Sequence, residues 1–514
     1  MLHMRFAISI CIGVAACALA SASQVRPNIL FILADDLGYG DVGFTWQTPA
    51  SSTPRIHTPN LDKAARAGVI LSSHYAAAPV CAPSRASLMS GRSQPRCSVR
   101  NNDFDSPLTE PDTLATLLKS QGYRTYAVGK WGIGGGGESG LPVTAHPLDK
   151  GFDEFYGFMD HLAGHTYYHY DGTIRNAWMG ITENRSRANS SAEGIYSTDL
   201  FTAKTKQFIE RHISLHPSEP FFIYLAINTI HGSGRLGADV PVKTPIHVPA
   251  APYPPGGGLC GGVRWPLPKE PESQRNTYID PAYQNRNLPI PAMRYGTAIT
   301  RFDHAFGDLM QELADLHIST NTIVIFTSDN GPTAEYGTDP RFFLSAGPFD
   351  GEKRDVYEGG MRVPTFVWGI PGAAGIIDHS PSQSPDWMAT LAALAHAPAP
   401  PDCDGVNLLA RWTSNPSSAP ASKIYTQYFF PSGYLDAYAQ TVAARKGRIR
   451  GQQQMMRTGS IVALRTNLDE TGADTPVRIY DVVEDPGQTR DLAPSHPGMA
   501  AEYQAILERQ RLNP

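Results

Sequence analysis

Cysteine is scarce in this sequence, and long runs of one charge or of apolar residues are almost absent. Six cysteines among 514 residues exclude a small fold held by disulfide bonds, so a hydrophobic core must supply the stability. The formal net charge is −5 and no basic run is present, which excludes nucleic acid as a partner. The one extended apolar run, residues 6–20, is too short for a comfortable membrane span. By length, about two to four domains are expected.

The first 22 residues have the pattern of a signal peptide. A short basic start, "MLHMR", precedes the apolar run, and small residues then offer Ala-x-Ala cleavage sites after Ala20 and Ala22. This pattern predicts export to the periplasm or the extracellular space. The segment "VAAC" also resembles a bacterial lipoprotein processing site, so lipid anchoring through Cys17 is the alternative.

Removal of this segment leaves four cysteines, Cys81, Cys97, Cys260 and Cys403. If Cys81 has a function of its own, at most one disulfide bond can form among the other three. The sequence does not identify the pair.

Several short apolar runs end abruptly in polar residues, which is typical of strands buried on both faces of a parallel sheet. Four of these runs cover residues 28–36, 123–131, 221–231 and 322–331. Segments with apolar residues at helical spacing occur between and beside them, at residues 111–123 and 295–310. This alternation predicts an α/β fold: a doubly wound, mixed but mostly parallel sheet with helices on both faces.

The pattern changes after residue 412. Shorter strands are expected at residues 460–468 and 476–486, and a helix at residues 499–510 closes the chain. We therefore predict a large α/β domain over residues 25–412 and a smaller α+β domain with an antiparallel sheet over residues 413–514. Within the large domain, residues 233–291 are rich in proline and glycine, and we expect them to form a mouth, a lid or a surface insertion.

Acidic side chains follow two of the predicted neighbouring strands. Asp35 and Asp36 end the first run, and Asp329 ends the last. Open parallel sheets bind ligands beyond the carboxyl ends of their strands, so we expect these carboxylates to meet there. Their mutual repulsion requires a proton or a cation. With the amide oxygen of Asn330 they form an all-oxygen set, which favours calcium or magnesium over zinc. The alternative is that each aspartate is a turn residue.

Basic side chains are predicted on the opposite side of the same site. Arg85, Lys130 and Lys353 supply positive charge, and His231 ends a strand. A cation and carboxylates on one side, with arginine, lysine and histidine on the other, suit a tetrahedral oxyanion ester. Taken singly, each basic residue is more often a solvated surface charge.

Cys81 lies at the start of a predicted helix in "VCAPSRASLMSGR". Pro83 is tolerated in a first helical turn, and "SRASLM" continues as helix. A helix N-terminus attracts anions and makes a thiol more acidic, which predicts a reactive Cys81. The residues alone leave two interpretations open, a buried core cysteine and a nucleophile.

The stretch "CAPSR", followed by "ASLMSGR", matches the Cys-x-Pro-Ser-Arg signature of the type I sulfatase family. Supporting stretches in the same order are "PNILFILADDLGYGD", "TPNLDKAARAG", "GYRTYAVGKWG", "GFDEFYGF", "TIVIFTSDNG", "EKRDVYEGGMRVP" and "IYDVVEDPGQTRDLA". The resemblance extends over nearly the whole mature chain and looks like a bacterial-type branch of the family. It implies an alkaline phosphatase-like fold, with the sulfatase catalytic domain at residues 25–412. It also implies that the protein is a sulfuric ester hydrolase.

The resemblance also implies that Cys81 is not used as a thiol. In this family a formylglycine-generating enzyme oxidises the matching cysteine to formylglycine, whose aldehyde hydrates to a geminal diol. One diol oxygen attacks sulfur and the alcohol leaves. The second hydroxyl lets the sulfated intermediate collapse to the aldehyde, a release route that serine or a thiol lacks.

Site roles carry over from the family position by position. The calcium ligands correspond to Asp35, Asp36, Asp329, Asn330 and the modified Cys81. Arg85 matches the arginine that holds the formylglycine. Lys130 and Lys353 match lysines that bind sulfate oxygens, and His231 matches the histidine that protonates the leaving oxygen.

One position departs from the family pattern. Many members have Gly-Lys-Trp-His-Leu-Gly where this chain has "GKWGIG", so Gly132 replaces a histidine thought to act as base in sulfate release. The later stretch "HLAGHTYYH" offers His165 as a catalytic substitute. The alternative is that His165 is an ordinary loop histidine.

The expected substrate is a sulfated carbohydrate or, as a second choice, an aryl sulfate. Tyr167, Tyr168 and the 233–291 insertion suggest a polar, aromatic-lined sugar pocket, although such aromatic clusters more commonly pack in a core. Two alternatives accompany this prediction. One is a phosphonate monoester or phosphodiester hydrolase on the same scaffold, and the other is a non-catalytic binder of sulfated glycans.

Overall fold

The structure of the protein is a computed structural model, which describes most of the chain between residues 26 and 512. The described ranges are 26–46, 56–102, 106–136, 143–161, 163–168, 180–188, 192–232, 246–284, 287–335, 339–413, 420–428, 452–468 and 476–512. The predicted signal peptide, with Cys17, lies outside these ranges, and so does part of the 233–291 insertion.

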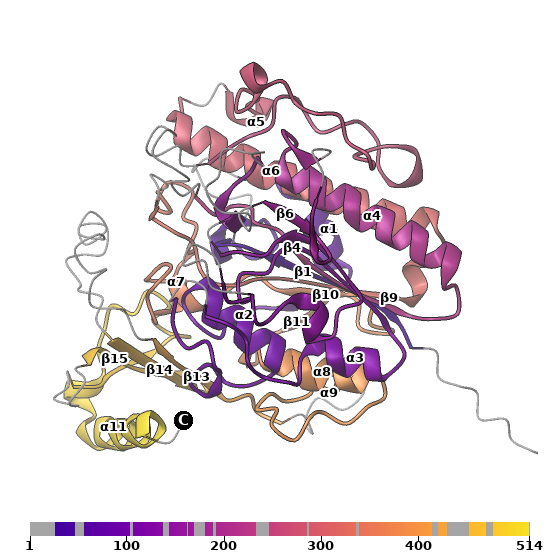
Figure 1. Cartoon of the computed structure of the whole chain (residues 1–514). Helices are drawn as coiled ribbons and strands as arrows, with labels where there is room; N and C mark the ends of the chain where they lie inside the picture. The colour runs from indigo at the N-terminus through magenta and orange to yellow at the C-terminus, as the bar shows by residue number, and fades with distance from the viewer. Residues whose placement is uncertain are drawn as a thin grey trace, which may run out of the picture.

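A sheet of ten strands forms the centre of the described structure (Figure 1). Its middle strands run parallel, and the antiparallel pairs lie on either side of them. In spatial order the strands are β11 (Ile376–Asp378), β2 (Val69–Leu71), β10 (Phe366–Trp368), β9 (Thr322–Ser328), β1 (Asn28–Ala34), β8 (Phe221–Ala226), β4 (Arg124–Lys130), β5 (Glu154–Phe158), β6 (Ile181–Glu183) and β7 (Ser186–Arg187). The prediction of a mixed, mostly parallel sheet is confirmed.

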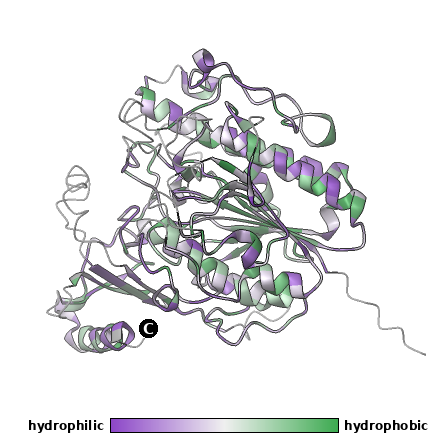
Figure 2. Ribbon diagram, viewed as in Figure 1, coloured by the Kyte–Doolittle hydropathy of each residue, from purple (hydrophilic) through white to green (hydrophobic). Residues whose placement is uncertain are grey.

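The central strands are buried on both faces because their apolar runs supply side chains to two separate cores. In β1, Leu30 and Ile32 join one hydrophobic cluster, while Ile29 and Phe31 join the other. Every residue of β1, β8 and β9 is buried. Apolar residues accordingly gather in the middle strands, whereas the covering helices carry both kinds of residue (Figure 2).

Helices cover both faces of the sheet, as predicted. One hydrophobic cluster includes side chains of α1 (Pro59–Arg66), α4 (Ser197–Leu215) and α6 (Ile290–Asp315). The other includes side chains of α2 (Cys81–Ser90), α3 (Leu114–Ser120) and α8 (Asp386–Leu394). The two sets lie on opposite sides of the strands in Figure 1. Three short helices are α5 (Pro281–Gln284), α7 (Glu358–Met361) and α9 (Leu409–Trp412).

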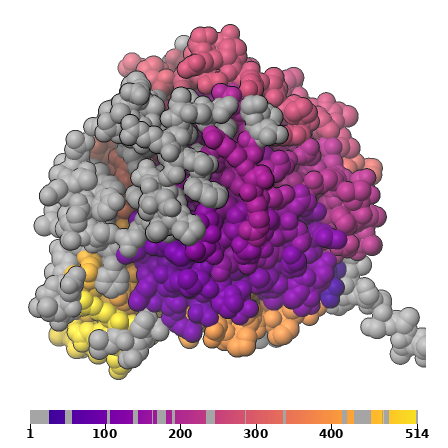
Figure 3. Space-filling model, in the orientation of Figure 1, coloured from indigo at the N-terminus to yellow at the C-terminus, as the bar shows by residue number. Residues whose placement is uncertain are grey.

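A second, antiparallel sheet lies near the C-terminus. Its strands, in order, are β13 (Ile424–Tyr428), β14 (Gln452–Thr458), β15 (Ile461–Leu468) and β16 (Arg478–Asp481). The terminal helix α11 (Pro497–Leu512) packs on this sheet through Leu507, which clusters with Tyr425 and Ile479. Figure 3 shows these last residues, in yellow, at one edge of the molecule. The predicted strands and helix are confirmed, while the domain boundary at residue 412 stays a prediction.

Two observations bear on other expectations from the sequence. Within the described ranges, no helix combines the length and the apolar character that crossing a membrane requires.

Cys97, Cys260 and Cys403 are all free thiols in this structure, so the one disulfide bond that the sequence allowed is not formed among them.

Candidate active site

The candidate site lies at the carboxyl ends of four adjacent strands. Strands β1 and β9 pair in parallel up to Ala34 and Ser328, so Asp35 and Asp329 emerge side by side. Lys130 ends β4, and His231 follows β8 on a turn whose Thr229 carbonyl oxygen accepts a hydrogen bond from the Asp35 amide (3.1 Å). The polar residues that follow these strands therefore lie together at one edge of the sheet, as the sequence predicted.

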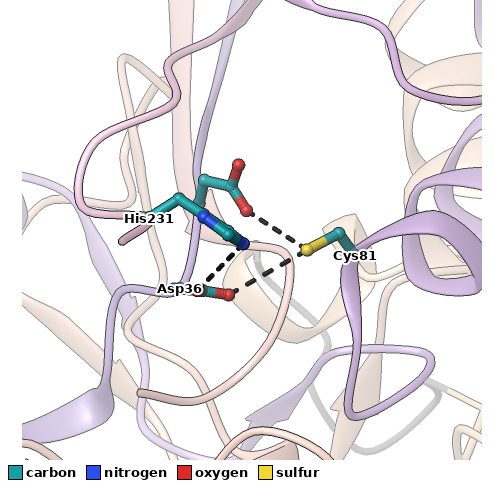
Figure 4. Close-up of side chains that lie close together, drawn as sticks. Asp36, Cys81 and His231 are labelled. Carbon is teal, nitrogen blue, oxygen red and sulfur yellow. Dashed lines mark hydrogen bonds and ion pairs between the residues drawn. The ribbon is translucent and has the colours of Figure 1, made fainter. Parts of the chain in front are cut away.

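The carboxylates face the sulfur of Cys81. Its Sγ atom lies 3.3 Å from Asp35 Oδ1 and 4.0 Å from Asp36 Oδ1 (Figure 4). Asp36 has a positive φ of 60°, which turns its backbone so that its amide donates to Asp329 Oδ1 (3.1 Å). Cys81 is the first residue of α2, so the helix N-terminus points at this cluster.

The oxygen atoms of this cluster fit a hard divalent cation. Asn330 donates through Nδ2 to Asp36 Oδ1 (2.8 Å), whereas its Oδ1 atom is buried with no hydrogen-bond partner among the described residues. Burial and the charge of Asp35 raise the pKa of Asp329 to about 7. Both features would be relieved by a cation bound among the carboxylates. An all-oxygen donor set is the type that calcium prefers.

Two basic side chains, Arg85 and Lys130, pair with the same carboxylates. Arg85 donates from Nε to Asp329 Oδ2 (2.9 Å) and from Nη1 to the Lys130 carbonyl oxygen (2.9 Å). Lys130 Nζ lies 2.6 Å from Asp35 Oδ2. Burial alone would raise the pKa of Asp35, but Lys130 and Arg85 outweigh it and hold that pKa well below its usual range.

Lys353 and His231 form a pair beside Asp36. Lys353 Nζ lies 2.9 Å from Asp36 Oδ2 and 2.9 Å from His231 Nε2. His231 Nδ1 lies 2.7 Å from the Gly232 carbonyl oxygen, so Nδ1 carries the hydrogen and Nε2 accepts from Lys353. Burial and Lys353 lower the pKa of His231 to about 4, which keeps its ring neutral near pH 7.

The prediction of an acidic thiol at Cys81 is wrong. Burial, together with the negative charge of Asp35, raises the pKa of Cys81 well above its ordinary value. The helix N-terminus carries only a partial positive charge, whereas Asp35 carries a full negative charge with its Oδ1 atom 3.3 Å from the sulfur. The helix therefore does not bring the pKa of Cys81 back down. The unmodified cysteine is therefore a poor nucleophile here.

Two buried histidines lie beside the site, and only one of them was predicted. The ring of His165 stacks on the ring of His231, with centroids 3.6 Å apart and planes 11° apart. His161 contacts the edge of His165 and approaches Gly132, whose carbonyl oxygen is 3.4 Å from His161 Nδ1. A Cβ atom on Gly132 would also lie 3.4 Å from that nitrogen. The sequence signal for His161 was its spacing of four residues from His165 in "HLAGH".

The two tyrosines expected in a sugar pocket belong to the core instead. Tyr167 and Tyr168 are at most 1% exposed. Their hydroxyl groups donate to the carbonyl oxygens of His231 and Val248, both at 2.9 Å. They hold the backbone around the site and present no surface on which a sugar ring could stack.

The sequence of the chain is similar to that of a known group of proteins. The family model described as Sulfatase matches residues 27–397. The N-acetylgalactosamine-6-sulfatase of Homo sapiens is 31% identical over 414 residues, which are 76% of this chain and 66% of the relative. This chain thus spans about two thirds of that relative's length. Arylsulfatase A of Bos taurus is 28% identical over 541 residues, covering 97% of this chain and 89% of the relative.

A solved structure gives the same picture of the fold. The crystal structure of Ps i-CgsB in complex with k-i-k-neocarrahexaose superposes with a TM-score of 0.69 at 24% identity, covering 94% of this chain and 92% of that one. At this level of identity the likeness shows the fold. It agrees with the alkaline phosphatase-like architecture predicted from the sequence.

Proposed function

The chain belongs to the sulfatase family, and from this premise we propose that it hydrolyses sulfate esters with Cys81 converted to formylglycine and one calcium ion bound beside it. The single observation that carries the proposal is the position of the Cys81 sulfur. It lies within 4.0 Å of both Asp35 and Asp36, at a site that Lys130 and Lys353 close from the other side.

The modification and the metal would supply the reactive chemistry. Formylglycine provides a hydrated aldehyde, whose two hydroxyl groups allow first attack on sulfur and then release of sulfate. Calcium provides positive charge for the sulfate oxygens. Its ligands would be Asp35, Asp36, Asp329, Asn330 and the modified residue 81. Arg85 holds this set together through its bonds to Asp329 and to the backbone of Lys130.

The chain's own cations would bind the sulfate group. Lys130 and Lys353 contact the Oδ2 atoms of Asp35 and Asp36, whereas the Cys81 sulfur contacts their Oδ1 atoms. Both are at most 2% exposed, and a charge is worth far more in such a dry site than in water. On binding substrate, the two lysines exchange part of their contact with Asp35 and Asp36 for sulfate oxygens.

His231 would handle the proton of the leaving group. Its Nε2 atom accepts from Lys353 Nζ at 2.9 Å, so an ammonium proton and an imidazole lone pair are adjacent. As the ester bond breaks, a proton held between these two groups passes to the leaving oxygen. The bond from Nδ1 to the Gly232 carbonyl oxygen fixes the ring orientation during this transfer.

The base that acts in sulfate release would be His161. Burial and Lys130 lower its pKa well below the usual range, so the ring is neutral and able to accept a proton. Its position against Gly132 supports this role, because the family histidine stands at that place in the sequence. The prediction that His165 is the base remains a prediction. Its stacking on His231 supports a positioning role.

The substrate class we propose is a sulfated carbohydrate, with simple aryl sulfates as lesser substrates. The support comes from the names of similar proteins, an N-acetylgalactosamine-6-sulfatase and a crystal structure in complex with k-i-k-neocarrahexaose. Maturation would require a formylglycine-generating enzyme. We further propose export through residues 1–22, with lipid anchoring at Cys17 as the alternative, and the domain division at residue 412.

Mass spectrometry of the peptide that contains Cys81, combined with an activity panel, tests the proposal. We expect the mass of formylglycine in active protein and no turnover in the Cys81→Ala variant. An unmodified thiol throughout a fully active preparation would refute the mechanism.

The panel also separates the alternatives. A preference by orders of magnitude in kcat/KM for phosphonate monoesters or phosphodiesters would favour the related hydrolase. Glycan binding without turnover, in protein confirmed to carry the modification, would favour a non-catalytic binder.

A further inference from the structure

Lys353 pairs with a second carboxylate besides Asp36. Its Nζ atom lies 2.9 Å from Asp36 Oδ2 and 3.7 Å from Glu335 Oε2. Asp36 is a proposed calcium ligand, whereas Glu335 lies on the loop after β9 and is not a member of the proposed metal site. A lysine ammonium group is a point charge on a flexible stem, so its position depends on the groups that pair with it. Glu335 can therefore hold Lys353 in place while Asp36 is engaged with a metal.

The carboxylate of Glu335 is itself fixed by the residue next to Lys353. Arg354 donates from Nε to Glu335 Oε1 (2.5 Å), and both side chains are at most 7% exposed. Burial would raise the pKa of Glu335, but the positive charges of Arg354 and Lys353 outweigh it and lower that pKa to about 2. The ionised carboxylate thus bridges the two cations, with one oxygen facing each of them.

The backbone at Arg354 connects this pair to the segment that carries Cys81. The Arg354 amide donates to the carbonyl oxygen of Pro79 (2.7 Å), two residues before Cys81, and the Lys353 amide donates to the carbonyl oxygen of Pro332 (2.7 Å). Arg354 has a positive φ of 73°, a conformation that residues with a side chain rarely adopt. Such a conformation persists only where the surrounding contacts hold it.

The C-terminal sheet supplies contacts that hold this turn. Gln453 in β14 is 1% exposed, and its Nε2 atom donates to the Arg354 carbonyl oxygen (2.8 Å). Its Oε1 atom accepts from the Val356 amide (3.4 Å). Arg354 donates from Nη1 to the hydroxyl group of Tyr428 in β13 (3.1 Å). Val356 and Tyr428 also belong to one hydrophobic cluster. The side chain and the backbone of Arg354 are therefore both bonded to the sheet.

We propose that Glu335 and Arg354 are positioning residues for Lys353, and that Tyr428 and Gln453 of the C-terminal sheet hold them in place. This inference rests on the proposed function, in which Lys353 binds the sulfate group. The two sheet residues then act on the reaction through Arg354 and Glu335. Displacement of a catalytic group by about 1 Å can cost about 100-fold in rate, so a remote contact of this kind affects turnover.

Kinetics of formylglycine-carrying enzyme on para-nitrophenyl sulfate tests the inference. Glu335→Gln keeps the size of the side chain but removes its charge. We expect kcat to fall by about 10- to 100-fold with a much smaller change in KM, because the transition state depends more on the position of the ammonium group than the bound ester does. A lower KM with unchanged kcat would show that Glu335 only repels the substrate anion. A lower melting temperature with unchanged kcat and KM would show a role in stability alone. Either result would overturn the inference.

Milder variants test the contribution of the sheet. Tyr428→Phe and Gln453→Met each remove hydrogen bonds to Arg354, and each should lower kcat by about fivefold. The matched controls are Tyr425→Phe and Gln454→Met, in the same two strands. Gln454 Nε2 donates to the Tyr425 hydroxyl group (2.8 Å) and to the Leu507 carbonyl oxygen in α11 (3.1 Å). The controls should lower the melting temperature and leave kcat unchanged. Equal losses of kcat in tests and controls would overturn the role of the sheet.

Variants of Arg354 test whether the contacts form one chain. Arg354→Lys keeps a positive charge for Glu335 and should retain more activity than Arg354→Gln. Tyr428→Phe added to Arg354→Gln should cost no further kcat, because the tyrosine acts through the guanidinium group that is already missing. Multiplicative losses in this double variant would mean that Tyr428 acts independently of Arg354, which contradicts the proposal.

A crystal structure of the Glu335→Gln protein separates this inference from the proposed function. We expect the Lys353 ammonium group to leave its place 2.9 Å from His231 Nε2. A displaced Lys353, together with fully modified wild-type enzyme that hydrolyses no sulfate ester, would support the positioning role and refute the sulfatase function. An undisplaced Lys353 with wild-type kcat on para-nitrophenyl sulfate would overturn the positioning role and support the sulfatase function.

Discussion

The ring of His161 occupies the space beside Gly132: its Nδ1 atom is 3.4 Å from the place that a Cβ atom on Gly132 would take. Gly132 has a φ of 70°, which a larger residue adopts only with strain. The chain thus has a glycine and a spatially adjacent histidine at the position where many members of the family have a histidine. If the proposed role of His161 is correct, the imidazole that serves sulfate release comes from a different loop in this chain.

Replacement of His161 by glutamine should lower kcat by about 100-fold, the effect typical of a missing general base. Glutamine preserves the size of the side chain but cannot accept a proton. Steady-state kinetics on an aryl sulfate measures the change. His146→Gln is the control, since His146 is also buried but bonds to the carbonyl oxygen of Asn184 (2.8 Å), away from the site. An unchanged kcat in the His161 variant would remove this residue from the mechanism.

Replacement of His165 by phenylalanine and by alanine should give different results. If His165 acts by stacking on His231, phenylalanine keeps a flat ring in contact and most of the activity. Alanine frees His231 to tilt, and a misplaced catalytic group can cost about 100-fold in rate. The comparison uses kcat for the two variants at equal calcium. Equal, severe losses in both would show that the ring nitrogens of His165 are needed, which is what its alternative role as the base requires.

Calcium should stabilise the protein as well as support turnover. Asp35, Asp36 and Asp329 repel one another, so a cation among them favours the folded state over the unfolded one. At a calcium concentration 100 times the Kd, the free energy of unfolding should rise by about 2.7 kcal/mol. Thermal melts with chelator and with added calcium measure this shift. The shift should shrink in Asp329→Asn and persist in Asp149→Asn, whose carboxylate lies far from the site in an exposed pair with Arg185. Identical melting curves with and without calcium would contradict a metal at this site.

The parts of the site that follow strand ends could be predicted from the sequence. A buried parallel strand delivers the residue after its end to one edge of the sheet, so Asp35, Lys130 and Asp329 were placed by local pattern alone. Lys353 is different. It lies on the long loop after β9, where its own amide donates to the Pro332 carbonyl oxygen. No strand end marks its position, so only its charge and then the family resemblance assigned it to the site.

The features that the sequence analysis missed depend on burial and on loop packing. The acidity of Cys81 was misjudged because its helix position is local, whereas the charge of Asp35 comes from a residue 46 positions away. His161 and the buried tyrosines depend on how the chain after β5 folds back over Lys130 and His231. No periodicity encodes such a loop, because its side chains bond to backbone groups of distant segments.

The contribution of Asp41 to the free energy of unfolding should fall as the pH rises from about 4 to about 7. This carboxyl group is fully buried, and its Oδ2 atom accepts from the Gly38 amide and the Tyr295 hydroxyl group, both at 2.8 Å. Burial raises the pKa of Asp41 to about 7, against about 4 in the unfolded chain. Between these values the unfolded state has lost the proton and the folded state retains it.

Folding therefore takes up a proton in this range, and the free energy of unfolding loses up to about 1.4 kcal/mol per pH unit. Below about pH 4 both states are protonated, and above about pH 7 both are ionised, so the slope from this group vanishes at either end. Asp41→Asn keeps an oxygen for Gly38 and Tyr295 but does not titrate. Its stability relative to the wild type should rise across the range and then level off.

Urea unfolding at several pH values measures this difference. The surface variant Asp149→Asn is the control: Arg185 lowers the pKa of Asp149, so that carboxylate is ionised in both states above about pH 5 and adds no slope there. If the difference in the free energy of unfolding between Asp41→Asn and the wild type stays constant from pH 4 to pH 7, Asp41 is already ionised in the folded protein. The buried carboxyl group would then need a compensating charge, and the hydroxyl group of Tyr295 would not be enough to stabilise it.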